Sequence, residues 1–311
     1  MREIVVNKHI AGQRLDKFLM RYLGAAPKTF VHKMIRKKNI VVNGKRVEGS
    51  YIIAADDIIN LYLSDETIDK FTKTTARGEF SGGLDIIYED ENIAIVNKSA
   101  NLLTQPDSAH SDSLVSRLRH QTDSDFAPVA VNRLDRNTTG IVLCAKTLAS
   151  AQILSKLVHD RAIGKHYLAA VHGEISREMV LEGYHTKDEA KNLVKIVPRG
   201  TAGQHVITKI APMGYDPAQG ITLLKIVLET GRSHQIRAHL ASIGHPIVGD
   251  FKYGGKGGTR QMLHAHEVVF GPVDGVLSYL SSQSFTSPLP KDMEKLIVAV
   301  NLKNSKDCFI M

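Results

Sequence analysis

The sequence predicts an α+β protein in which a mixed, largely antiparallel sheet follows a small N-terminal unit made of an αα-hairpin and short strands. From residue 84 onward, strand-like apolar runs far outnumber the helical segments that could connect parallel strands. Between residues 64 and 83 apolar periodicity disappears, so this segment indicates a connection between two units. A strong difference in charge separates the same two parts of the chain.

Composition is typical of a globular protein. The 311 residues, 43% of them hydrophobic, are enough for a sizeable core. No window approaches the roughly 18 uncharged apolar residues of a membrane span, and "MREIVVNKHIAGQ" lacks the apolar segment of a secretory signal. We therefore expect a cytoplasmic protein. Cys144 and Cys308 are the only cysteines, which argues against a disulfide framework, a thiolate metal cluster and redox chemistry.

The net charge of +8 is concentrated at the N-terminus. Residues 1–62 hold 12 lysines and arginines against 5 acidic residues, a balance of +7, whereas the other 249 residues hold 28 against 27. A positive field at one end indicates a docking surface for a polyanion, because cations that neutralise phosphates release counterions. On charge alone, an ordinary solvated face is an equally good interpretation.

The first N-terminal element is predicted to be a short amphipathic helix in "GQRLDKFLMRYLG". Leu15, Phe18, Leu19 and Tyr22 share one helical face, and Gly24 can end the helix. A helix with one apolar face needs a partner to cover that face. We therefore expect the next element to pack against it.

A second helix is predicted in "KTFVHKMIRKKN", with Pro27 in its first turn. Apolar residues spaced by four, Phe30 with Met34 and Val31 with Ile35, form its core side. Its other face groups the cationic side chains Lys28, His32, Lys33, Arg36 and Lys37.

The segment "NIVVNGKRVEG" predicts a tight hairpin. Asn43-Gly44 lies between two strand-like runs, and both residues tolerate a positive φ; Lys45 and Arg46 follow in the turn. A final strand is expected in "DDIINLYL". Two helices, a hairpin and a strand resemble the ribosomal-protein S-four-type RNA-binding module over about residues 12–63. The resemblance implies that the cations of the second helix and of this turn bind RNA.

We predict four parts along the chain: an RNA-binding domain over 1–63, a linker over 64–83, a second domain over 84–303 and a tail over 304–311. The linker "SDETIDKFTKTTARGEFSGG" is rich in small polar residues. Strands of the second domain are predicted at "LDIIYED", "NIAIVNK", "GIVLCAK", "KHYLAAVHG" and "ITLLKIVLE". A helix is predicted over 147–158, where one face carries Ala151, Leu154, Leu157 and Val158.

Two polar segments interrupt the apolar pattern of the second domain. "VNRLDRNTTGIVLCAKT", residues 131–147, places Asp135 between Arg133 and Arg136, directly before a strand-like run. A surface turn capped by Asp135 and Asn137, or a structural ion pair, would explain this segment by itself. The second segment, "LETGRSHQIRAHLASIGHPIVGDFKYGG", groups Arg232, His234, Gln235, Arg237 and His239.

Three segments in this order, "RLDRNTTG", "GKHYLAAVHG" and "TGRSHQIRAHLASIGHPIVGD", are similar to the motifs of the RluA-type large-subunit rRNA pseudouridine synthases. With the N-terminal module, the resemblance covers residues 12 to about 300. It implies the pseudouridine synthase fold, a sheet with a central cleft, and an isomerase that converts uridine to pseudouridine in RNA. The implied partner is 23S ribosomal RNA or an assembling large subunit. No cofactor is implied, and we expect a monomer.

The resemblance also implies roles for single residues. Asp135 matches the catalytic aspartate, a nucleophile on the target uridine: the glycosidic bond breaks, the uracil turns, and a carbon–carbon bond forms. Arg237 matches the arginine that pairs with this aspartate and would keep the carboxylate ionised in a cleft, where burial favours the neutral form. Tyr167 matches the aromatic residue on which the extruded base stacks. Attack on the base and attack on the sugar both stay open.

Two further residues are placed by the resemblance among those that contact RNA. Arg133 matches a residue that fills the gap left by the flipped uridine. Lys98 matches the lysine of the first family motif, and its chemistry suits a support of the sheet and site more than a participant in the reaction. Two departures concern specificity: Asn132 stands where histidine is frequent before "RLD", and "SANLLTQP" follows Lys98 in place of Pro-x-Gly.

The sequence favours this isomerase over two other classes of function. A catalytically lapsed RNA-binding or ribosome-assembly protein would keep the fold, but the presence of Asp135, Tyr167 and Arg237 argues against it. A metal-dependent nuclease needs clustered acidic ligands, and the sequence has none. His234 and His239 lack a carboxylate or thiolate partner at ligand spacing, so no metal site is expected.

Overall fold

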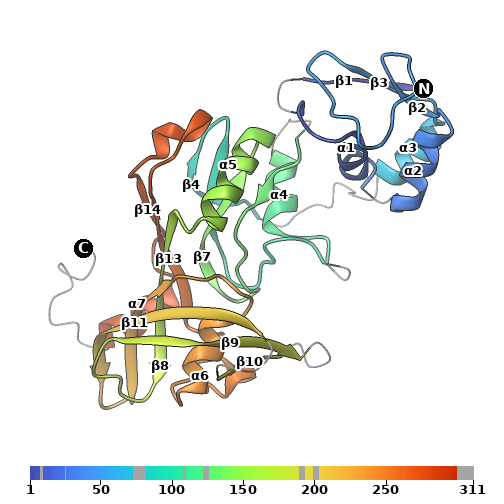
Figure 1. The fold of residues 1–311 in the computed structure, drawn as a ribbon. Helices are drawn as coiled ribbons and strands as arrows, with labels where there is room; N and C mark the ends of the chain where they lie inside the picture. The colour runs from blue at the N-terminus through green and yellow to red at the C-terminus, as the bar shows by residue number, and fades with distance from the viewer. Residues whose placement is uncertain are drawn as a thin grey trace.

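The computed structural model describes residues 1–7, 10–24, 26–72, 82–107, 110–121, 126–188, 193–198 and 203–299. Within them the chain forms a small N-terminal unit and a larger unit built on an 11-stranded sheet (Figure 1). The sheet is mixed and largely antiparallel, so the predicted fold class is confirmed.

The small unit packs its helices against a 3-stranded antiparallel sheet of order β1-β3-β2. Helices α1 and α2 bury the apolar faces that the sequence predicts for them, and these faces form one core with the sheet. The elements of the unit are β1 (Arg2–Val5), α1 (Leu15–Tyr22), α2 (Lys28–Arg36), β2 (Ile40–Val42), β3 (Ile58–Leu61) and α3 (Asp65–Thr72).

The tight turn after β2 lies where the sequence predicts it. Asn43 and Gly44 have φ values of 50° and 70°, a region that these two residue types tolerate best. The run beyond the turn does not become a second hairpin strand, because only Lys45 bridges back to Val42. Strand β2 pairs with β3 instead. The partner of β2 therefore comes from a later part of the chain, which the local pattern does not reveal.

The segment predicted to be a linker begins with helix α3. Ile68 of this helix is fully buried in the core of the small unit. The prediction of a linker is therefore wrong for residues 65–72, where one buried side chain anchors an otherwise polar helix. Residues 73–81 and the predicted tail 304–311 lie outside the described residues, and the four predicted parts of the chain stay a prediction.

The sheet of the larger unit has the strand order β10-β9-β11-β12-β8-β13-β7-β5-β4, with β14 beside β13 and β6 beside β7. Among the described strands, β13 and β7 make the parallel pair. The strands are β4 (Asp85–Glu89), β5 (Ile93–Lys98), β6 (Val129–Ala130), β7 (Thr139–Ala145), β8 (Ile163–His172), β9 (Met179–Asp188), β10 (Leu193–Val197), β11 (Gln204–Asp216), β12 (Ile221–Leu228), β13 (Leu263–Phe270) and β14 (Ser284–Thr286).

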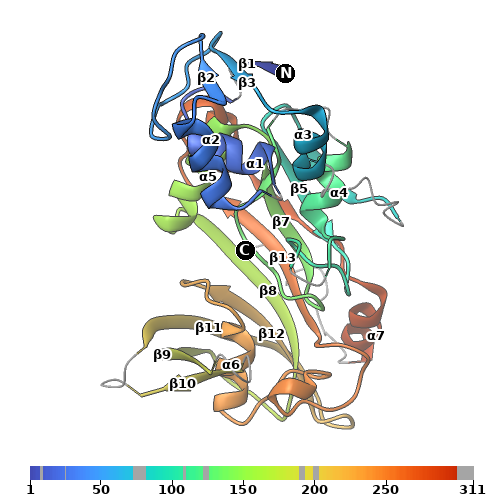
Figure 2. The ribbon, with the colours of Figure 1, turned by 90° about the vertical axis from the view of Figure 1, so that its right-hand side faces the viewer.

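Helices cover parts of this sheet at both of its halves. Figure 2 shows the long strands β8 and β13 running from the half near α5 to the half that holds α6 and β9 to β12. Helix α5 begins with a capping box of Thr147 and Ser150, one residue later than predicted. The helical elements are α4 (Leu114–Gln121), α5 (Leu148–His159), α6 (Gln235–Ser242), α7 (Lys291–Ala299) and the 3-10 turns η1 (Phe251–Tyr253) and η2 (Gly275–Leu280).

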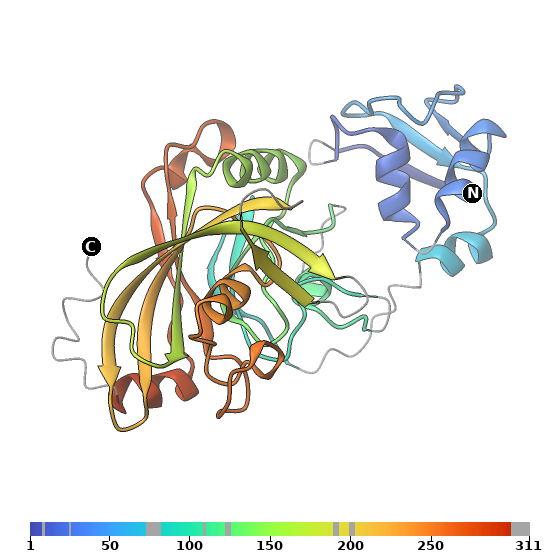
Figure 3. The same ribbon diagram turned by 60° about the horizontal axis from the view of Figure 1, so that its bottom comes forward.

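The two units meet at an apolar contact. Phe126 of the larger unit is 2% exposed and belongs to the core of the small unit. The guanidinium of Arg21 lies 5.7 Å from the centre of the Phe126 ring. Leu148 and Ala151 of α5 pack against the same core. Figure 3 shows the small unit beside the end of the larger unit that carries α5.

Two further observations bear on function. In the described part of the chain, no helix is long and apolar enough to cross a membrane. Cys144 is buried, and burial raises the pKa of its thiol to about 12. This thiol is therefore a core group and not a nucleophile.

Candidate active site

The loop between β6 and β7 carries Asp135 and is held by side chains from elsewhere. The hydroxyl of Thr104 donates to the Leu134 carbonyl at 3.0 Å and accepts from the Leu134 amide at 3.1 Å. Arg260 donates to the carbonyl of Asn137 at 3.2 Å. Both ends of this short segment are thus fixed through the backbone, so Asp135 extends from a rigid support.

Lys98 also holds this loop, through a hydrogen bond to the Arg136 carbonyl, and its side chain does not contact solvent. It is 0% exposed, and its ammonium donates to the carbonyls of Ser99, Leu102 and Arg136 at 2.8, 2.8 and 3.0 Å. Burial lowers the pKa of Lys98 to about 7, whereas three carbonyl acceptors match the three N–H groups of the charged form. The prediction that Lys98 contacts RNA is wrong, because its ammonium is fully buried and donates to three backbone carbonyls. The predicted role as a support of the site agrees with these contacts.

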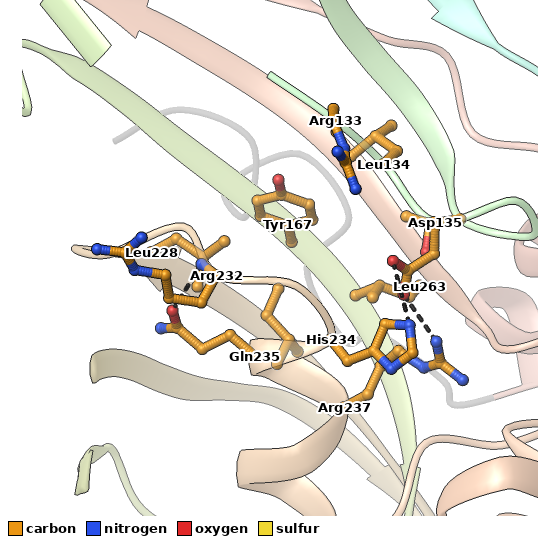
Figure 4. Close-up of a pocket in the computed structure, with 12 residues that line it drawn as sticks. Arg133, Leu134, Asp135, Tyr167, Leu228, Arg232, His234, Gln235, Arg237 and Leu263 are labelled. Atoms are coloured by element: carbon orange, nitrogen blue, oxygen red, sulfur yellow. Dashed lines mark hydrogen bonds and ion pairs between the residues drawn. The ribbon is translucent and has the colours of Figure 1, made fainter. Parts of the chain in front are cut away.

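Asp135 forms an ion pair with Arg237, a residue 102 positions further along the chain (Figure 4). The Arg237 Nη1 group donates to Oδ2 of Asp135 at 2.7 Å. The remaining donors of the guanidinium, Nε and Nη2, bind the two oxygens of Asp250 at 2.6 and 2.7 Å. Arg237 therefore links two carboxylates, of which Asp250 is buried and Asp135 faces the cleft.

Arg237 keeps its charge in this position. Burial lowers the pKa of Arg237, but the hydrogen bonds and charges of Asp250 and Asp135 outweigh burial and raise it overall. The ring of Tyr253 covers the guanidinium at 4.9 Å. Such a buried pair contributes little net stability, so its main effect is to fix charge and geometry.

The segment before α6 is held by Gln235. Its side-chain oxygen accepts from the Thr230 hydroxyl and the Arg232 amide at 2.9 and 3.1 Å. Its amide nitrogen donates to the Ile207 carbonyl and the Thr208 hydroxyl on β11 at 3.0 and 2.9 Å. Two of the four contacts connect the start of α6 to β11, and the other two fix the segment that leads from β12 into the helix, which places Arg237 in the first turn of α6 against the Asp135 loop.

Tyr167 comes from the middle of β8 and lies beside Asp135. It is 7% exposed, and burial together with the charge of Asp135 raises the pKa of its hydroxyl. Figure 4 shows Tyr167, Asp135 and His234 facing the same space, with Arg133 above it. These four residues line one small cavity of about 50 Å³. The structure thus brings together three predicted site residues, Asp135, Arg237 and Tyr167, with Arg133 exposed at the rim.

Wider hollows extend from this cavity on two sides. One, of about 670 Å³, is lined by the cations Arg161, Lys165 and Arg232. The other, of about 480 Å³, is lined by Arg136 and Lys252. Positive walls on both sides of Asp135 suit a polyanionic strand that continues beyond the reacting nucleotide.

The predicted RNA-binding residues of the small unit are not part of this site. All of them are exposed on α2 or on the turn after β2, and they are Lys28, His32, Lys33, Arg36, Lys37, Lys45 and Arg46. An exposed basic surface is available to phosphates. The structure therefore separates the candidate docking residues from the candidate catalytic ones.

Sequence reasoning missed three residues of the site. Asp250 and Tyr253 stand in the segment "GHPIVGDFKYGG", and His234 stands in the second polar segment without a predicted role beside Asp135. The signal for Asp250 is a lone carboxylate in an apolar stretch after a motif with an arginine, because a buried arginine needs a second acceptor. No local signal indicates Tyr253, whose role depends on tertiary contacts.

Asn132, a departure from the family pattern, has a structural place. Its side-chain nitrogen donates to the Ile141 carbonyl at 3.1 Å, and its oxygen accepts from the Leu143 amide at 2.8 Å. The side chain thus extends the pairing along β7, and Asn132 lines the wider hollow beside Asp135 but not the small cavity. Among the described residues, no group of three or more His, Cys, Asp or Glu could hold a metal ion.

Comparison with known proteins agrees with this geometry. Residues 92–242 match the family model described as RNA pseudouridylate synthase, and residues 13–59 match the model of the S4 domain. The ribosomal large subunit pseudouridine synthase C of Pasteurella multocida (strain Pm70) is 30% identical over 99% of this chain and 96% of its own length. The uncharacterized RNA pseudouridine synthase YlyB of Bacillus subtilis (strain 168) is 31% identical over 95% of this chain and 96% of its own.

Solved structures share the fold of the larger unit. Human RNA pseudouridylate synthase domain containing 4 has a TM-score of 0.56 at 19% identity, over 70% of this chain and 92% of its own. Human RNA pseudouridylate synthase domain containing 1 has a TM-score of 0.51 at 23% identity, over 70% and 94%. At this identity the likeness concerns the fold alone.

The relatives and the family model define an isomerase that acts on RNA, and the site agrees with this class: an aspartate paired with a buried arginine lies beside a buried tyrosine in a basic cleft. The chain belongs to the RNA pseudouridylate synthase family and carries an S4 domain at its N-terminus. It converts uridine to pseudouridine in RNA, and a role as a lapsed RNA-binding protein is not favoured.

Proposed function

We propose that the substrate is 23S ribosomal RNA, free or in an assembling large subunit, and that a monomer acts on it in the cytoplasm without a cofactor. The names of the relatives that match nearly the whole chain support this substrate. The exposed basic face of the S4 domain supports a large polyanion rather than a single nucleotide.

Asp135 is the proposed nucleophile, and its contact with Arg237 is the observation that carries this role. The guanidinium occupies Oδ2 and leaves Oδ1 for attack on the uridine. Attack by Oδ1 forms a bond between Asp135 and the uridine, and the bond between the sugar and the ring nitrogen of uracil breaks. The detached uracil then turns, its ring carbon bonds to the sugar, and the bond to Asp135 breaks, which restores the carboxylate. The ring carbon loses a proton and the freed ring nitrogen gains one, so the product has the same atoms as the substrate.

Two further residues have proposed roles around the extruded uridine. The ring of Tyr167 supplies a stacking surface that replaces the neighbouring bases. Arg133, exposed at the rim, enters the gap left in the RNA. Among the described residues Arg133 makes no hydrogen bond or ion pair, so its side chain can move without breaking one.

The S4 domain is the proposed docking module. Its seven exposed basic residues on α2 and the following turn supply affinity and register, and they take no part in the chemistry. The cations that flank Asp135 hold the RNA on either side of the reacting nucleotide.

A single experiment tests the proposed function. The purified protein is incubated with protein-free 23S ribosomal RNA in the presence of a chelator and without cofactor, and pseudouridine is mapped along the RNA. We expect pseudouridine at one or a few uridines. Pseudouridine on transfer RNA or 16S ribosomal RNA alone would contradict the 23S assignment, and dependence on a metal ion would contradict catalysis by the protein's own residues.

A further inference from the structure

The two oxygens of Asp135 have different surroundings. Oδ2 accepts a hydrogen bond from Arg237, whereas Oδ1 faces Nε2 of His234 at 3.7 Å. This distance is too long for a hydrogen bond but short enough for the direction of an N–H dipole to matter. The state of the His234 ring therefore affects the oxygen that the proposed mechanism uses for attack.

His234 is fixed from its other nitrogen. Its Nδ1 lies 3.0 Å from the hydroxyl oxygen of Tyr253, and the two rings meet edge to face at 86°. The backbone amide of Val194 donates to the same hydroxyl oxygen at 3.1 Å. The imidazole thus stands between a tyrosine hydroxyl on one side and a carboxylate on the other.

Both neighbours select the same tautomer of a neutral imidazole. Because the Tyr253 oxygen already accepts from Val194, its own proton is free to go to Nδ1, which then has no hydrogen. With Nδ1 bare, Nε2 carries the N–H and points it at Oδ1. The opposite tautomer would set the lone pair of Nε2 against the negative charge of Asp135, which is repulsive.

Burial favours the neutral form of the His234 ring. Burial is the largest cause that lowers the pKa of His234, and although the charge of Asp135 raises this pKa, the pKa is lowered overall, with smaller contributions from Arg237 and Lys252 in the same direction. Two cations and two carboxylates thus surround the ring. A neutral ring has one N–H group, so the nitrogen that carries the hydrogen determines whether Oδ1 of Asp135 faces an N–H group or a lone pair.

We infer that Tyr253 and His234 are positioning residues: the Tyr253 hydroxyl holds His234 as the Nε2–H tautomer, and this N–H orients the free oxygen of Asp135 toward the uridine. His234 itself occupies the position before α6 with a φ of 55°, so the backbone is set to present the ring at this place. The inference rests on the proposed role of Asp135, and its structural half can be measured without RNA.

Nitrogen NMR of the protein labelled at histidine measures that half. The resonance of His234 is assigned by its loss in His234→Gln. We expect the neutral ring to show a bare Nδ1 and a protonated Nε2, and we expect Tyr253→Phe to change this into a mixture of tautomers. A neutral ring with its proton on Nδ1 in the wild-type protein overturns the inference, whatever the activity.

Single-turnover rates measure the functional half. Tyr253→Phe removes only the hydroxyl and leaves the ring on Arg237, so we expect a fall of about threefold to tenfold with unchanged affinity for RNA. His234→Asn tolerates the left-handed backbone but ends too early to reach Oδ1, whereas the amide nitrogen of His234→Gln can replace Nε2. We expect the Gln variant to retain about ten times the rate of the Asn variant.

A double-mutant cycle separates positioning from packing. Tyr253→Phe should cause no further loss in the His234→Gln background, because no tautomer is left to fix. An equal loss in both backgrounds would show that Tyr253 acts only through its ring, and the inference would be wrong. Melting temperatures of the variants show which are folded. A wild-type protein that is inactive on every RNA contradicts the proposed function, and the NMR result still decides the tautomer.

Discussion

The two units use the same kind of side chain in opposite ways. In the S4 domain, Lys33 and Arg36 are exposed, and within the described part of the chain their side chains form no hydrogen bond or ion pair. In the larger unit, which we call the catalytic unit, Lys98 and Arg237 are buried, and every nitrogen of their charged groups donates to a carbonyl or a carboxylate. We expect cations of the first kind to provide affinity that depends on salt, and those of the second kind to fix geometry.

This difference determines where arginine and lysine can replace each other. A phosphate attracts any nearby cation, so an exposed arginine and an exposed lysine are nearly equivalent there. A guanidinium between two carboxylates uses a planar set of donors that an ammonium cannot copy. The predictions below test this contrast.

The largest effect is expected at Asp135. Asp135→Asn keeps the shape of the side chain and removes the anion, so pseudouridine formation should become undetectable. Binding of RNA, measured by filter retention, should stay within a few-fold, because affinity comes from other residues. Asp274→Asn, at an exposed aspartate, is the matched control and should be fully active. Substantial turnover by Asp135→Asn would remove this residue from the mechanism.

The exchange of arginine for lysine should separate the units most directly. Arg237→Lys cannot bind Asp135 and Asp250 together, so we expect turnover to fall by more than about tenfold and stability by about 2–4 kcal/mol. Arg36→Lys in the S4 domain should leave both unchanged. Single-turnover kinetics and urea denaturation measure the two quantities. Equal effects of the two substitutions would mean that the contrast between the units is wrong.

Loss of the basic face should change affinity and not chemistry. Replacing Lys33, Arg36 and Lys37 with Ala should lower the slope of log affinity against log salt by up to about two to three. At saturating RNA the variant should approach the wild-type rate, since docking residues do not stabilise the transition state.

A control for this variant removes the same number of charges elsewhere. Arg177, Lys291 and Lys295 are exposed on the catalytic unit and lie outside the hollows beside Asp135. Their replacement with Ala should leave the slope nearly unchanged. If both triple variants shift it equally, the basic face of the S4 domain is ordinary solvated surface.

The smallest effect concerns acid stability. His239 and His264 are buried in the catalytic unit, and burial lowers the pKa of each to about 4. Between pH 4 and the ordinary histidine value the unfolded chain binds more protons, so stability is present above about 6.5 and falls as the pH drops toward 4. We expect a loss of about 1–2 kcal/mol per histidine at pH 5, measured by denaturation. In His264→Gln the loss should be smaller, and an unchanged pH dependence would contradict this assignment.

Local rules predicted the elements whose cause is local. The turn at Asn43-Gly44 lies where turn preferences place it, and α5, predicted from its apolar face, begins one residue later than predicted, at a cap formed by Thr147. Helix α3 was missed because Ile68 and Phe71 are too few apolar residues to establish a periodicity. Its stability comes from packing in the small core, which no local window contains.

The residues of the site could be predicted only where a family motif indicates a contact between residues that are far apart in the sequence. The pairing of Asp135 with Arg237 came from the resemblance to a family, since 102 residues separate the two. Asp250 was not predicted, because its signal, a lone carboxylate in an apolar stretch, does not show which arginine it binds. Lys98 was predicted to contact RNA, but it is buried. A sequence shows that a lysine can be charged, but it does not show whether backbone carbonyls surround the side chain.

The contact at Phe126 sets the distance between the S4 domain and the site around Asp135. A side chain of the catalytic unit that completes the core of the S4 domain keeps the basic helix at a set span and angle from Asp135. If the S4 domain docks RNA as proposed, we expect the target uridine to lie at a matching separation in the folded RNA. We then expect two uridines with the same flanking bases to be distinguished by the shape of the RNA around them.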